Sequence, residues 1–267
     1  MDALGETSVT RFMSFLAWLV YAALTLPILM VIGASLTAGA YLSFPPQGLS
    51  LRWWNVMIQD PDMVNGFVVT ARVAVLAVLI SVPSGALAAI FLSRQPPVRR
   101  NLLAAIFTSP LSVPLVLTGF SFLVFFTQLG LLNEVGLVIG HTVIAVPYVL
   151  RSALASLSLN DTSLPRAAAI HGAKPWQVIW HVTIPMMKAG LISGGLFAFL
   201  ASVNNIVVSV FVSQPGDNPL PVVIFSRMEN LAEPSVAAAS AAVIIATAVI
   251  CLVMEKRYAL FRSLAGR

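Results

Sequence analysis

Four polar side chains gather in an otherwise apolar stretch near residue 205. Ser202, Asn205 and Ser209 follow i, i+3, i+7 spacing and therefore share one face of a helix, with Asn204 beside them. Amide groups both donate and accept hydrogen bonds, and polar groups in an apolar span tend to face a bundle interior or an aqueous path. The chemistry expected here is hydrogen bonding, either to a passing solute or to a neighbouring helix.

No catalytic site is predicted. The three histidines, His141, His171 and His181, do not cluster with the further ligands that a zinc site needs, and His141 has no evident serine elbow. No G-x-x-x-x-G-K-[ST] segment for nucleotide phosphates is present, and Cys251 is the sole cysteine. We therefore expect no enzymatic activity, no metal site and no cofactor bound by this chain.

Composition indicates a membrane protein. Hydrophobic residues make up 58% of the chain, charged residues only 9%, and the mean hydropathy is +0.93, whereas soluble domains are about 25% charged. The pI of about 9.9 would suggest nucleic acid binding in a soluble protein, but membrane topology explains it better, so no nucleic acid partner is expected. Asp2 and Glu6 precede the first apolar run, which we expect to remain in the membrane as a span.

The apolar segments predict an all-α integral membrane protein with a single transmembrane domain over residues 1–267. A helix needs about 20 mostly apolar residues to cross the hydrocarbon core. Six spans are predicted, at residues 12–36, 67–92, 102–129, 135–157, 187–212 and 236–254.

Lysine and arginine gather in alternate loops, which predicts orientation. The positive loops and C-terminal tail hold Arg94, Arg99, Arg100, Arg151, Arg166, Lys174, Lys188, Lys256, Arg257, Arg262 and Arg267. Both termini and the loop at residues 158–186 are therefore expected to face the cytoplasm. Trp53 and Trp54, in an outer loop, suit an interfacial anchor. The outer segment 213–235 is either a docking site for an extracytoplasmic partner or a plain connection.

The loop at residues 158–186 is the longest polar interruption between two spans. Its residues 167–169 are alanines that favour helix, Gly172 can end a helix, and Pro175 suits the first turn of the next. We expect a helix, a tight turn and a second short helix. A compact helical loop of this kind usually docks against another protein.

This loop resembles the cytoplasmic loop of bacterial ABC-importer permeases of the binding-protein-dependent type I family. That pattern reads Glu-Ala-Ala, three residues, Gly-Ala, and about nine residues to apolar-x-apolar-Pro. The resemblance implies that a separate ATPase subunit docks here, on Arg166, Ala167, Ala168, His171, Gly172, Ala173, Lys174 and Pro185. Arg166 replaces the family's Glu: it either meets an acidic residue of the ATPase, with Lys174 or the partner permease as alternative contacts, or points to solvent.

Residues 201–226 resemble the fifth span and following loop of the spermidine/putrescine branch of this family. The branch's acidic pair falls on Asn204 and Asn205, which removes the Coulomb attraction for a polycation. Arg72 either snorkels to the outer interface or faces the path. We hypothesise a solute less cationic than spermidine (a zwitterion, an organic anion or a neutral molecule), with a path lined by Ser202, Asn204, Asn205, Ser209 and Arg72.

The resemblance implies an inner-membrane importer working by alternating access. Its other parts would be a second permease, most often a different chain, two ATPase subunits carrying ATP and Mg, and an extracytoplasmic binding protein. The main alternative is a secondary transporter or channel not coupled to an ATPase, but we find no acidic residue in a span core that could serve as a relay. A membrane enzyme lacks a nucleophile, and a purely structural subunit leaves the docking loop unexplained.

Overall fold

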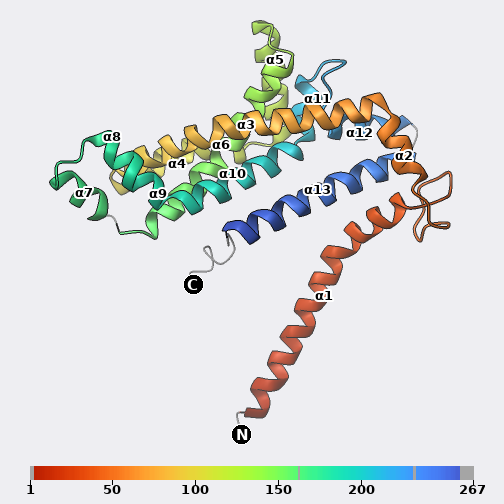
Figure 1. The fold of residues 1–267 in the computed structure, drawn as a ribbon, viewed down its shortest axis with the longest axis horizontal. Coiled ribbons are helices and arrows are strands. Elements are labelled where there is room, and N and C mark those ends of the chain that lie inside the picture. The colour runs from red at the N-terminus through yellow and green to blue at the C-terminus, as the bar shows by residue number, and fades with distance from the viewer. Residues whose placement is uncertain (1–2, 162, 231–232, 259–267) are drawn as a thin grey trace. The chain divides into compact units, whose positions relative to one another are not determined.

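The computed structural model describes residues 3–161, 163–230 and 233–258, which are almost entirely helical (Figure 1). Within these ranges there is no strand, and Thr37 and Leu49 form an isolated β-bridge. Arg262 and Arg267, which belong to the charge pattern, lie outside the described residues. The elements are α1 (Ala3–Ser35), α2 (Arg52–Gln59), α3 (Pro61–Ser93), α4 (Pro97–Thr108), η1 (Ser109–Leu111), α5 (Leu115–Leu129), α6 (Glu134–Ser158), α7 (Ser163–Ile170), α8 (Pro175–Val178), the π-helical turn η2 (Ile179–Thr183), α9 (Ile184–Met186), α10 (Lys188–Val203), α11 (Ile206–Val212), α12 (Leu220–Asn230) and α13 (Ser235–Tyr258).

Four helices are long and apolar enough to cross a bilayer. They are Thr10–Ser35 within α1, and α3, α6 and α13, and they coincide with the first, second, fourth and sixth predicted spans. Two bent pairs correspond to the other spans: α4 and η1 meet α5 at 85°, and the segment from α8 to α9 meets α10 at 69°. The described helices therefore supply four spans, or up to six if each bent pair is one span.

The chain divides into two compact units, which are described separately. Unit 1 comprises residues 1–63 and 224–247, and unit 2 comprises residues 64–223 and 248–267. In unit 1 the Trp53 indole is buried and donates to the Gly39 carbonyl at 3.0 Å. The Trp54 indole donates to the Ser35 hydroxyl at 3.3 Å. Trp53 thus packs inside this unit instead of lying exposed as an interfacial anchor.

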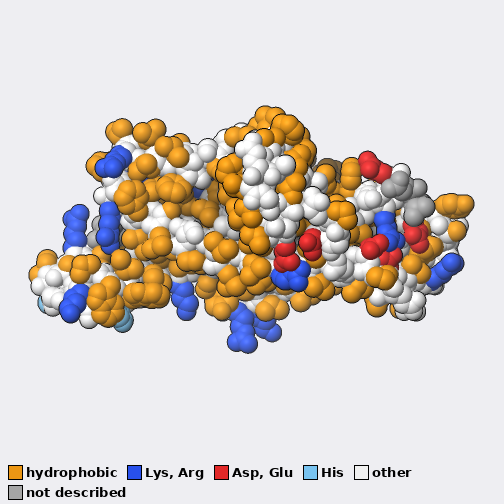
Figure 2. Space-filling view, turned by 90° about the horizontal axis from the view of Figure 1, so that it is seen from above, with side chains coloured by type: hydrophobic (Ala, Val, Ile, Leu, Met, Phe, Trp, Pro, Cys, Tyr) orange, Lys and Arg blue, Asp and Glu red, His pale blue; other side chains and the backbone are white. Residues whose placement is uncertain are grey.

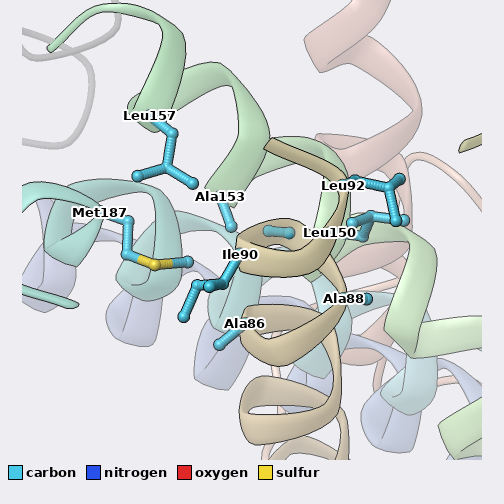
Figure 3. Packing of buried hydrophobic residues seen from close by; sticks show 9 residues of the cluster. Ala86, Ala88, Ile90, Leu92, Leu150, Ala153, Leu157 and Met187 are labelled. Carbon is cyan, nitrogen blue, oxygen red and sulfur yellow. The ribbon is translucent and has the colours of Figure 1, made fainter. Parts of the chain in front are cut away.

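Unit 2 is built on close packing of α3, α6 and α10. Nine buried residues form one apolar cluster, in which Ile90 of α3, Ala153 of α6 and Met187 converge (Figure 3). Gly190 and Gly194 on α10 let its backbone approach α6, because a Cβ at either position would collide with α6 atoms. Small residues at such spacing are the usual means of close helix packing in membranes.

Hydrophobic side chains cover most of the face shown in Figure 2; acidic side chains lie beside basic ones in small groups, and other basic side chains stand alone. Exposed large apolar residues occur on nearly every long helix. A soluble monomer rarely exposes apolar surface on this scale, so the surface agrees with lipid contact and with partner subunits.

Candidate functional site

The loop between α6 and α10 folds as predicted, into two short helices joined at Gly172. The Ala173 N–H donates to the Ala168 carbonyl at 3.1 Å and the Gly172 N–H donates to the Ala169 carbonyl at 3.0 Å, a Schellman ending. Gly172 has φ +88°, which a residue with a side chain adopts only under strain. The second helix begins at Pro175, where the Lys174 N–H donates to the Gln177 side-chain oxygen at 2.8 Å.

This helix–turn–helix presents both charge and apolar surface. Arg166, His171 and Lys174 are exposed, with none of their side chains buried against the rest of unit 2. Ile170 is 85% exposed and Trp180 is 64% exposed. In Figure 1 α7 and α8 lie beside each other at one end of unit 2. The remaining predicted loop residues also belong to this segment: Ala167, Gly172 and Pro185 are exposed, while Ala168 and Ala173 are half-buried.

The two ends of the loop are tied together by hydrogen bonds. The Asn160 side-chain amide donates to the Met186 carbonyl at 3.0 Å and to the Ser156 carbonyl at 2.7 Å. The Ser156 hydroxyl also donates to the Met186 carbonyl, at 3.2 Å. Because Met186 directly precedes the 69° bend into α10, these bonds connect the loop to both α6 and α10. A force on the loop would therefore reach both helices.

The fifth predicted span is interrupted at Asn204 and Asn205, where α10 ends and α11 begins. The buried Asn205 side chain accepts from the Val208 N–H at 3.0 Å and so caps α11. Asn204 is exposed, and its amide donates to the Leu200 carbonyl at 2.9 Å. The two amides therefore differ: Asn205 is used inside the fold, and Asn204 faces outward.

His141 of α6 lies buried between the two halves of this broken segment. Its Nδ1 is 2.7 Å from the Ser202 hydroxyl on α10, and its Nε2 is 3.1 Å from the Ser209 hydroxyl on α11. Sequence reasoning found the two serines on one face but missed this partner, which is 61 residues from Ser202. The structure therefore places a histidine beside two serines. The Ser209 hydroxyl donates to the Asn205 carbonyl at 2.6 Å, so these groups form a network of hydrogen bonds within the fold.

Arg72 forms an ion pair with Glu134 at the start of α6. The Arg72 Nε lies 2.5 Å and its Nη2 lies 2.6 Å from the two carboxylate oxygens, a two-point contact. The side chains are 48% and 27% exposed. The sequence left Arg72 open between the interface and the path, and the ion pair shows that a carboxylate of this chain offsets its charge. Within the described ranges, no three His, Cys, Asp or Glu side chains are grouped as a metal site would require.

Comparison with known proteins identifies the family of this chain. Residues 81–263 match the family described as the inner membrane component of binding-protein-dependent transport systems. The chain belongs to this family. It is therefore an ABC-importer permease subunit in the inner membrane, a multi-pass transport component rather than an enzyme.

Curated relatives of this permease carry different solutes. It is 32% identical to the putrescine transport system permease protein PotI of Escherichia coli (strain K12), over 71% of this chain and 70% of that protein. It is 26% identical to the spermidine/putrescine permease PotC of Haemophilus influenzae, over 85% and 89%. It is 28% identical to the molybdenum transport permease ModB of Escherichia coli, over 79% and 100%.

Solved structures agree on the fold. A chain of a bacterial ABC transporter that imports the acidic polysaccharide alginate superposes with a TM-score of 0.72 at 18% identity, covering 94% of the permease and 97% of that chain. An amino acid ABC transporter crystallised with histidines gives a TM-score of 0.55 at 18% identity, over 80% and 98%. The all-helical permease fold predicted from the sequence is confirmed.

Proposed function

We propose that this permease lines half of a membrane path for a small solute and couples that path to a separate ATPase through residues 163–186. The observation that carries the proposal is the helix–turn–helix, which is rigidly capped at Gly172 and tied to α6 and α10 at its base. The second half of the path belongs to a companion permease, most often a different chain. Two ATPase subunits supply ATP hydrolysis, and an extracytoplasmic binding protein delivers the solute.

The orientation follows from the charges of the loops. Arg94 lies between α3 and α4, Arg99 and Arg100 lie in the first turn of α4, and Lys256 and Arg257 lie in the last turn of α13. By the positive-inside rule these segments, the 158–186 loop and both termini face the cytoplasm. Six spans accommodate this arrangement, with each bent helix pair counted as one crossing.

The docking surface combines apolar and basic side chains. Ile170 and Trp180 are exposed on a loop that would otherwise sit in water, and burying an apolar side chain of this size against a partner contributes about 1.5–3 kcal/mol. Exposed Arg166 and Lys174 favour an acidic rim on the ATPase. Because Arg166 replaces an acidic residue of the family pattern, the ATPase groove that receives it should carry the opposite charge.

Co-purification tests this contact. Ile170→Asp should reduce the ATPase recovered with the permease by tenfold or more, as expected from losing at least about 1.4 kcal/mol. Val98→Asp is the matched control, since Val98 is 84% exposed in the first turn of α4, beside Arg99 and Arg100, and Ile170 is 85% exposed. Equal recovery of the ATPase by both variants would contradict docking through this surface. An ATPase requirement would also separate the importer from a secondary transporter or channel.

In the proposed cycle, closure of the ATPase pair moves the loop as one body. The hydrogen bonds of Asn160 and Ser156 to the Met186 carbonyl pass this movement to α6 and α10. The path beside the break at Asn204 and Asn205 then opens to the other side of the membrane. The energy comes from ATP bound by the partner subunits.

The solute is proposed to be less cationic than spermidine. Asn204 is the member of the amide pair that faces outward, and it offers dipoles where the polyamine branch has a carboxylate. Arg72 contributes little free positive charge, because Glu134 holds it at two points. A path that is nearly neutral favours a zwitterion or a neutral solute over a polycation or a strong anion.

Ligand-stimulated ATP hydrolysis by the complex in lipid tests the solute class, with spermidine compared against amino acids, organic acids and phosphonates. Stimulation by spermidine in preference to the others would refute the proposal. Asn204→Asp should raise the response to cations, whereas Asn205→Asp should not, because that side chain is buried as the cap of α11. Equal effects of the two variants would show that the outward amide does not set solute charge.

A further inference from the structure

His141 occupies the point where the fifth predicted span is broken. Its ring belongs to α6, while its two hydrogen-bonding partners, Ser202 and Ser209, lie on either side of the break. His141, Ser202 and Ser209 are at most 4% exposed. Both nitrogens of this buried imidazole are hydrogen-bonded, as buried polar groups usually are. An apolar ring of similar size could fill the same volume but would form neither bond.

The hydrogen bonds assign the tautomer of the neutral ring. The Ser209 hydroxyl donates its proton to the Asn205 carbonyl at 2.6 Å, so the Ser209 oxygen accepts from Nε2–H of His141. In a neutral imidazole, which has one donor and one acceptor nitrogen, Nδ1 then accepts from the Ser202 hydroxyl at 2.7 Å. The three bonds run in one direction through a neutral ring, and this tautomer is assigned from the network.

The same break needs support that a continuous helix does not. Ending α10 at Val203 removes backbone hydrogen bonds in apolar surroundings, where each unsatisfied group is costly. The Asn205 cap satisfies one N–H of α11. This cap does not connect α10 to α6. Among the contacts described at the break, only those of the His141 ring connect both α10 and α11 to α6.

We propose that His141 is a positioning residue of the transport path. Its ring holds α10 and α11 at the angle that directs Asn204 away from the buried side chains of His141, Ser202 and Ser209 and toward the solute. This inference rests on the proposed function, since it takes Asn204 to face the path. The ring itself is buried and fully bonded, so it acts through the placement of Asn204 and not by touching the solute.

Thiol labelling of Asn204→Cys tests the proposal directly. The background variant Cys251→Ala removes the sole native thiol, and the whole importer complex is reconstituted in lipid with a membrane-impermeant methanethiosulfonate reagent as probe. With His141 intact, residue 204 should be labelled. Loss of two ordinary hydrogen bonds shifts an equilibrium by about 5- to 150-fold, so His141→Phe should slow labelling by a factor in that range.

Four further variants separate positioning from folding. Replacing both Ser202 and Ser209 by alanine should slow labelling as much as His141→Phe, and adding His141→Phe to that pair should change it by less than about twofold, since the three groups act as one unit. His141→Gln, which can still reach one hydroxyl, should fall between. Thr142→Val is the control, because the Thr142 hydroxyl bonds only to the Val138 carbonyl of its own helix in this structure.

The outcomes are distinguishable. Rates are measured on complex that elutes intact, so a variant that fails to assemble is replaced by His141→Gln. If Asn204→Cys is unlabelled while His141 is intact, the placement of the path is refuted, and this inference with it. If Asn204→Cys is labelled at the same rate with His141 and with His141→Phe, the path stands and the positioning role of His141 is refuted.

Discussion

Replacing Gly190 by alanine perturbs the contact on which unit 2 is built. A Cβ at position 190 would overlap the Ser152 carbonyl oxygen and lie 2.6 Å from the Ser156 Cβ. Carbon atoms pack at about 3.5–4.0 Å, so α6 and α10 would have to separate by about 1 Å. Such a gap forfeits about a quarter to a half of each dispersion contact across it. Overpacking against backbone costs typically about 1–3 kcal/mol.

Gly195→Ala is the matched control on the same helix. There the new Cβ would meet a methyl group of Val82 at 3.3 Å, and a side-chain methyl can move aside. Both variants gain about 1 kcal/mol in helix propensity, so their difference isolates packing against α6. With about 2–4 °C per kcal/mol for chains near this size and a cost of about 1–3 kcal/mol, Gly190→Ala should melt roughly 2–12 °C below Gly195→Ala when loss of monodisperse protein is followed against temperature. Equal melting temperatures would refute the close-packing argument.

Three other changes have definite expected outcomes. Asn205→Ala should lower the free energy of unfolding by about 1 kcal/mol through loss of the α11 cap, whereas Asn205→Asp keeps a capping oxygen. The melting temperatures of the two variants measure this difference. Gly172→Ala should strain the loop by about 1–2 kcal/mol at φ +88° and weaken ATPase stimulation without lowering the yield of permease. The Ser163 backbone N–H, and then its hydroxyl, hold the pKa of Asp161 below 3.8. The stabilisation from Asp161 is therefore present above that pH and lost as the pH falls through the lower folded value. Asp161→Asn should therefore flatten the melting-temperature profile below about pH 3.8.

Features encoded by local backbone preference could be predicted from the sequence. Gly172 ends one helix and Pro175 begins the next through backbone preferences that depend on few neighbours. The helix–turn–helix around them appears as expected. The four long spans follow from hydropathy in the same way, because a bilayer-length apolar run has few alternatives to helix. The predicted docking role of this loop and the six-span count remain proposals.

Features set by contacts between distant residues could not be predicted. Residues 187–212 read as one helix, and the signal for a break was the amide pair itself, since asparagine is a weak helix former and a good N-cap. Local rules did not say that Asn205 would cap and Asn204 would face outward. The partners of His141 and Arg72 lie more than 60 residues away, and hydropathy does not tell which helix faces meet.

These long-range pairs change how charge in the path should be interpreted. A count of polar residues in the sequence suggests a path with one cation, two amides and two hydroxyls. In the fold, the cation is held by Glu134, both hydroxyls are bonded to His141, and one amide caps a helix. The Asn204 amide also donates to the Leu200 carbonyl, but its side chain is exposed, so in the proposed path it is the group of these five that we expect to meet a solute. Solute preference should therefore respond to substitution at this one position far more than to the total polar content of the span.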